Sequence, residues 1–101
     1  MCSVERINFI NPYTRVFLTF PVEEIKEALR FIFRTVKIDD LDDALVNCWQ
    51  ISGALSERER KMLSMVQTIV SGTKDGHVKP EDFDVYKLAR KVAAEVLGKV
   101  D

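Results

Sequence analysis

The sequence predicts a mainly α-helical fold, in which an N-terminal β-hairpin (4–20) is followed by a compact bundle of about four helices (21–100). Two observations support this prediction. Apolar residues recur at helical spacing through four segments after residue 20, and Pro, Gly and capping residues separate these segments. The first twenty residues are instead rich in β-formers around a turn. With 101 residues and 47% hydrophobic content, the chain is expected to form a single domain, 1–101, with its own core.

The hairpin prediction depends on two short stretches of β-formers, 7–10 and 16–20. The intervening Asn-Pro-Tyr-Thr segment, 11–14, has turn chemistry because its proline fixes one backbone angle. An isolated two-stranded hairpin is only marginally stable in water. We therefore expect the hairpin to pack on the helices or to pair with another chain.

Two helices are predicted between Pro21 and Gly53. Pro21 opens the first helix, and glutamates in its first turn suit the helix dipole. The second helix is expected to begin near Asp39 or Asp40 and to end at Gly53. One long, kinked helix from Pro21 to Gly53 is the alternative. The predicted apolar stripe of the second helix consists of Ile38, Leu41, Leu45, Cys48 and Trp49.

Two further helices are predicted on either side of a loop at 71–79. Ser56 and Glu59 have the spacing of a capping box at the start of the third helix, and Gly72 is expected to stop that helix. Pro80 is expected to start the last helix, because proline is favoured in a first turn.

The overall charge and the cysteine content argue against several classes of protein. Fifteen basic and sixteen acidic residues give a net charge of −1, which disfavours a general binder of nucleic acid or membrane surfaces. Two cysteines do not make a disulfide framework, so a reducing, cytoplasmic compartment is expected. The N-terminus lacks a signal-peptide pattern, and the chain has no apolar run long enough for a bilayer.

Residues suited to catalysis are scattered along the sequence. His77 is the only histidine, and no cysteine lies near it in the chain. Cys48 lies on an apolar stripe, where cysteine usually behaves as a small hydrophobe. Cys2, Cys48 and His77 are too widely spaced to indicate a zinc site. We therefore expect neither an enzyme nor a cofactor.

Surplus apolar residues indicate protein association. Phe31 lies off the stripe of the first helix, Ile51 lies opposite the stripe of the second, and Phe17 belongs to the short hairpin. The leading prediction is a non-enzymatic interaction module or accessory subunit, which binds a protein partner or a second copy through these residues. The alternative is that the hairpin caps the helices and covers Phe31 without any partner.

Nucleic-acid binding is the second functional hypothesis. The segment 55–63, Leu-Ser-Glu-Arg-Glu-Arg-Lys-Met-Leu, resembles the opening of many helix-turn-helix transcription domains. Lys87, Arg90 and Lys91 would then face phosphates from the last helix. The 71–79 loop is longer than the tight turn of that motif, which weighs against the hypothesis.

A metal site is the third hypothesis. The segment 71–83 resembles a degenerate EF-hand calcium loop, with Gly76 at its sixth position. The resemblance implies Asp75 and Asp82 as the carboxylate ligands, at the fifth and twelfth positions. Two lysines in the loop oppose cation binding, and turn chemistry alone explains the segment.

A magnesium site on facing helices is the other form of the metal hypothesis. Asp39 and Asp43 have i, i+4 spacing, as do Glu23 and Glu27 on the preceding helix. This arrangement resembles the carboxylates of helical pyrophosphohydrolases. The favoured interpretation is that these acids stabilise helix N-termini and keep the surface hydrated.

Overall fold

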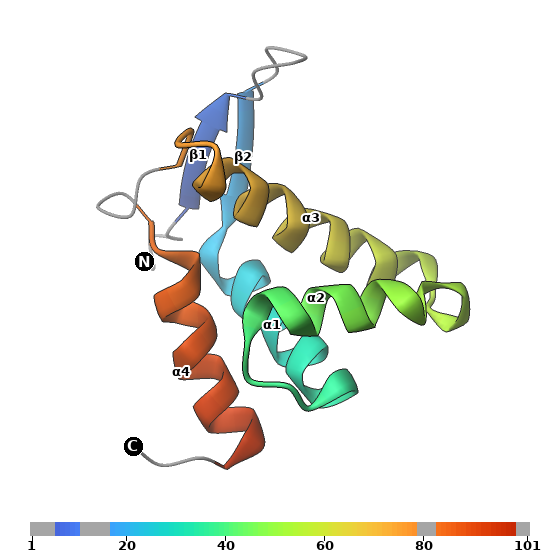
Figure 1. Cartoon of the computed structure of the whole chain (residues 1–101). Helices are drawn as coiled ribbons and strands as arrows, with labels where there is room; N and C mark the ends of the chain where they lie inside the picture. Colours follow the sequence, from blue (N-terminus) through green and yellow to red (C-terminus); the bar gives the residue numbers. More distant parts are fainter. Residues whose placement is uncertain (1–5, 11–16, 79–82, 99–101) are drawn as a thin grey trace, which may run out of the picture.

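The computed structural model describes residues 6–10, 17–78 and 83–98. Within these ranges the prediction of a mainly α-helical chain with four helices is confirmed (Figure 1). In chain order, the elements are β1 (Arg6–Ile10), β2 (Phe17–Pro21), α1 (Val22–Val36), α2 (Leu41–Gln50), the short 3₁₀ helix η1 (Ser52–Ala54), α3 (Glu57–Lys74) and α4 (Val85–Leu97). None of the described helices is both long enough and apolar enough to cross a bilayer.

The two strands pair antiparallel, and β2 leads directly into α1 (Figure 1). In the register of the two strands, Ile7 lies opposite Phe20, and Phe9 lies opposite Leu18. Phe20 is partly buried against the helical core. The turn predicted at 11–14 lies outside the described residues.

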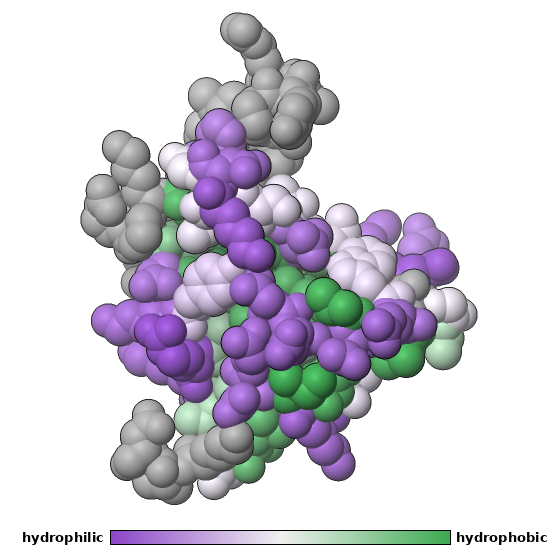
Figure 2. All heavy atoms as spheres, in the orientation of Figure 1, coloured by the Kyte–Doolittle hydropathy of each residue, from purple (hydrophilic) through white to green (hydrophobic). Residues whose placement is uncertain are grey.

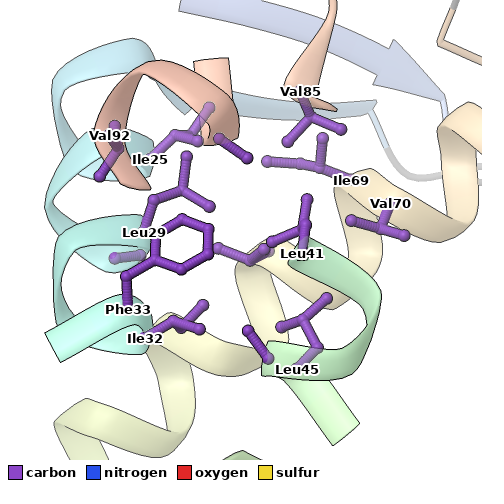
Figure 3. Packing of buried hydrophobic residues seen from close by; sticks show 14 of the residues in the cluster. Ile25, Leu29, Ile32, Phe33, Leu41, Leu45, Ile69, Val70, Val85 and Val92 are labelled. Atoms are coloured by element: carbon purple, nitrogen blue, oxygen red, sulfur yellow. The ribbon is translucent and has the colours of Figure 1, made fainter. Parts of the chain in front are cut away.

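Helix α1 lies at the centre of the molecule and packs against α2, α3 and α4. Figure 3 shows Leu29 and Phe33 of α1 pointing into a space that Leu41 of α2 and Ile69 of α3 help to fill. In the described part of the chain, no polar or charged residue is buried. The core is therefore held by apolar packing, and its interior contains no group that needs a charged partner.

The break between α1 and α2 rules out the single long helix. Lys37 has a left-handed backbone with φ of 55°, and its N–H donates to the Phe33 carbonyl at 2.8 Å. Asp40 then caps α2 by accepting a hydrogen bond from the Asp43 N–H at 3.1 Å. At its other end α2 stops at Gln50, and Gly53 lies within η1.

The capping box at the start of α3 is confirmed, but the predicted end of that helix is wrong. Gly72 is a buried residue inside α3, which continues to Lys74. Gly76, with φ of 82°, is the glycine that ends the helix. The His77 N–H donates to the Gly72 carbonyl at 2.8 Å, and the Gly76 N–H donates to the Thr73 carbonyl at 3.2 Å. These two bonds form a Schellman motif, which satisfies carbonyls at the helix end.

Helix α4 begins later than the sequence predicted. It starts at Val85, because the Asp84 carboxylate accepts a hydrogen bond from the Lys87 N–H at 3.0 Å and so caps the helix. Phe83 and Asp84 are not helical, so the prediction of a helix starting at Pro80 is wrong. Residues 79–82 themselves lie outside the described ranges.

Candidate functional site

An apolar surface lies on the outer side of α2 and just beyond its C-terminal end. In the described part of the chain, the large apolar side chains left exposed are Val46 (56%), Ile51 (43%) and Trp49 (38%). We call these three residues the α2 patch. Figure 2 shows hydrophobic surface in the region of α2, set among hydrophilic residues. Large apolar groups left in water are candidates for contact with a partner.

The helical repeat explains why α2 leaves these groups outside. The buried side of α2 is formed by Leu41, Ala44, Leu45 and Cys48, which pack into the core. Val46 and Trp49 are three residues apart, so they are neighbours on the helix surface, with Val46 opposite the buried side and Trp49 at its edge. Ile51 follows the helix as its C-cap residue.

The exposure of Trp49 contradicts a prediction from the sequence. It was expected in the buried stripe, because it follows Cys48 directly. One step along a helix rotates a residue by about 100°, which carries Trp49 from the centre of the buried side to its edge. No described element covers the ring completely, so more than a third of the side chain stays exposed.

The N-terminal half of α2 is tied to two other helices by polar contacts. The Asp42 carboxylate lies 3.2 Å from Lys74 Nζ of α3 and accepts a hydrogen bond from Tyr86 Oη of α4 at 3.1 Å. Burial and the hydrogen bond to Asp42 raise the pKa of Tyr86. The hydrogen bond to Asp42 raises the pKa of Lys74. Both groups therefore stay protonated to higher pH than usual.

An open cavity of about 360 Å³ lies beside this tie, between the start of α2 and α4. It is lined by Asp39, Asp40, Leu41, Tyr86, Ala89, Arg90, Ala93 and Ala94. The alanines leave space on the α4 side, and the rim carries charges of both signs. Among the described residues that line the cavity there is no Cys, Ser, Thr or His, so these residues supply no serine, threonine or cysteine nucleophile and no histidine base.

The predicted nucleic-acid residues lie on one side of α4. Lys87, Arg90 and Lys91 are exposed, and their i, i+3, i+4 spacing makes them neighbours. Arg90 borders the cavity that Asp39 and Asp40 also line. A phosphate backbone on this face would therefore meet carboxylates as well as cations.

The structure does not form a calcium loop at residues 71–74, because these residues belong to α3. Thr73 Oγ1 donates to the Ile69 carbonyl at 2.9 Å, and Ser71 Oγ accepts from Gln67 Nε2 at 3.3 Å. Asp75 is exposed at the helix end, and Asp82 lies outside the described residues. No group of three or more His, Cys, Asp or Glu side chains is placed to hold a metal ion in the described ranges.

The remaining candidates have different surroundings. Phe31 is partly buried and packs against the core, whereas the Phe17 side chain lies outside what the structure describes. Cys48 is buried, and burial raises the pKa of its thiol, which makes it a poor nucleophile. His77 is exposed, and its backbone N–H serves the end of α3.

Of the three residues predicted for partner binding, the structure therefore places Ile51 on the α2 patch. Val46 and Trp49 were missed by the sequence reasoning. Val46 could have been found, because helical spacing alone sets it opposite Leu41, Leu45 and Cys48. The exposure of Trp49 depends on which neighbours cover the edge of α2, and the sequence pattern does not carry that information.

Comparisons with models of protein families, with curated proteins and with solved structures found no match for this chain.

Proposed function

We propose that this protein is a non-enzymatic interaction module that binds a protein partner through the α2 patch. The observation that carries the proposal is the concentration of exposed Val46, Trp49 and Ile51 within six consecutive residues. The other large apolar side chains of the described core cluster are buried or partly covered. The α2 patch thus differs from the scattered single apolar residues that are normal on protein surfaces.

The composition of the α2 patch suits a binding centre. Tryptophan is enriched among the residues that dominate binding energy, because it removes a large apolar area from water when it enters a partner's pocket. Val46 lies one turn before Trp49 and Ile51 follows the helix as its C-cap residue, and both add exposed apolar surface. Three side chains cover less than the roughly 800 Å² per partner of a stable interface, so the partner also contacts the polar surroundings.

The contacts that the titratable side chains make with one another support a function that does not involve catalysis. Asp42, Lys74 and Tyr86 are engaged with one another across three helices. The cavity beside them is lined mainly by alanines and charged rim residues. This arrangement stabilises the packing of α2, α3 and α4, which in turn fixes the position of the α2 patch.

Nucleic-acid binding by α4 is the second proposal, and the exposed row of Lys87, Arg90 and Lys91 favours it. Binding through this row predicts an affinity for duplex DNA or RNA that falls steeply with salt. Replacing the three residues with Gln would abolish the binding. The absence of a mobility shift with any duplex at low salt would end this proposal.

The α2 patch proposal is tested by affinity purification of the tagged chain from its native host. Wild type, a Val46→Ser/Ile51→Ser variant and a matched Lys87→Ser/Lys91→Ser control on α4 are compared. A protein recovered in stoichiometric amounts with wild type and control, but lost with the patch variant, is the expected result. Equal recovery with all three chains, or no protein with any of them, would contradict the proposal.

A further inference from the structure

We infer that the segment bound by the α2 patch is a basic amphipathic helix of the partner, lying along the outer side of α2. This inference rests on the proposed function and adds the chemical class of the partner. Its basis is the division of the outer side of α2 into an acidic first turn and an apolar second half.

The acidic and apolar groups of α2 form one continuous strip. At about 100° per residue, Asp43 lies next to Val46, and Val46 lies next to Trp49 and Gln50. Asp43, Val46, Trp49 and Gln50 are all exposed. The exposed strip on one helix is matched in shape by the ridge of a second helix, which is a recurrent mode of peptide recognition.

The charged residue of this strip is Asp43, and the segment that contains the strip is acidic. Residues 38–57 contain five acidic residues and no Lys or Arg. Asp40 caps α2 and Asp42 pairs with Lys74, so both have partners within the fold. Asp43 is exposed, and its carboxylate forms no ion pair with any residue that the structure describes. A Lys or Arg beside the apolar stripe of the partner would complement Asp43, whereas an acidic residue there would be repelled.

A second copy of the chain fits the strip less well. Two α2 helices crossing antiparallel about a two-fold axis between Val46 and Trp49 would bring their apolar groups together. Asp43 of one copy would then approach residues 50–52 of the other, which carry no charge. The acid would therefore gain no partner across such a dimer. The strip therefore favours a heterologous helix.

Trp49 provides the measurement, because it is the only tryptophan and lies in the α2 patch. The probes are two synthetic helical peptides with the same leucine stripe, one flanked by lysines and the other by glutamates. The lysine peptide is expected to shift Trp49 emission to shorter wavelength in a saturable way. The glutamate peptide is expected to bind about tenfold more weakly, and added salt is expected to reduce this difference.

Two matched variants test the role of Asp43. Asp43 and Glu24 both occupy the third position of an acidic first turn, on α2 and α1 respectively, and both are exposed. Asp43→Lys is expected to weaken binding of the lysine peptide about tenfold, while Glu24→Lys leaves it within about twofold. Circular dichroism confirms that both variants are folded.

Several results would overturn the inference. These are equal affinity for the two peptides, no binding of either peptide, equal effects of Asp43→Lys and Glu24→Lys, or a dimer in sedimentation equilibrium that Val46→Ser dissociates. Failure here is distinct from failure of the proposed function. A native partner that is lost with the patch variant, together with peptides that are not discriminated, would leave the function in place and reject a basic helix as its ligand.

Discussion

In the first turn of α2, Asp42 is held by Lys74 of α3 and Tyr86 of α4, whereas in the second half Val46 and Trp49 extend from the same helix into solvent. Both halves pack into the core through the same buried, apolar side of α2, so the burial of that side does not distinguish the two halves. The polar ties concentrate at one end of the helix and the exposed apolar groups at the other. The first half therefore fixes the position of α2 and leaves its second half available for contact.

The largest expected effect on stability comes from a change on the buried side of α2, which both halves share. Leu45 is almost fully buried, and Leu45→Ala should lower the free energy of unfolding by about 2–4 kcal/mol, because it leaves a cavity in the core. The adjacent Val46→Ala should change it by less than about 0.5 kcal/mol. Urea unfolding of the two variants measures this contrast. Equal losses would mean that Val46 is a core residue.

A smaller effect on stability is expected from the first half of α2, which Asp42 connects to α3 and α4. Tyr86→Phe removes the hydroxyl that donates to Asp42 and should destabilise the chain by about 1 kcal/mol. A double-mutant cycle with Asp42→Asn isolates the coupling between the two side chains. Strict additivity of the two single changes would show that this hydrogen bond does not help to hold α2 against α4.

The contacts of Asp42 with Lys74 and Tyr86 also predict how stability depends on pH. The pKa values of Tyr86 and Lys74 are both raised in the folded chain, so the native state favours their protonated forms. Their contribution is complete below about pH 10 and is lost as the pH rises through the folded-state values. The melting temperature should therefore fall above about pH 10, and less steeply in Tyr86→Phe. Identical slopes for wild type and variant would remove Tyr86 as a cause.

The smallest effect on stability is expected in the exposed half. Val46→Ser should leave the free energy of unfolding within about 0.5 kcal/mol of wild type, because more than half of the residue is already exposed to water. The same change should clearly weaken partner binding. Denaturation and binding measured on one preparation separate these two outcomes, and a large loss of stability would place Val46 in the packing of the fold.

The sequence predicted those parts of the fold that local chemistry controls. The four helices follow from apolar spacing, and the Ser56–Glu59 capping box is present as expected, with bonds of 3.2 and 2.9 Å. The errors concern the ends of two helices. Gly72 and Gly76 both signal a helix end, and the chain uses Gly76 with its left-handed backbone. The last helix was expected to start at Pro80, but the side-chain cap of Asp84 sets its start at Val85.

The candidate site was less predictable than the fold, because it depends on contacts between distant segments. Tyr86 and Asp42 are 44 residues apart, and no pattern in the sequence links them. The exposure of Ile51 was predicted from its position in the sequence. Phe31 was predicted to lie away from the buried stripe, but it is partly buried against the core. Tertiary packing decides whether an apolar residue outside the main stripe stays exposed, and the periodicity of the sequence does not contain this information.

The most direct test of the central claim is the emission of Trp49 while a purified native partner is titrated into the chain. We predict that the emission moves to shorter wavelength and that acrylamide quenching falls, with saturation at a defined stoichiometry, because binding removes the ring from water. A partner that binds stoichiometrically while the emission and quenching of Trp49 stay unchanged would contradict the assignment of the α2 patch as the binding surface.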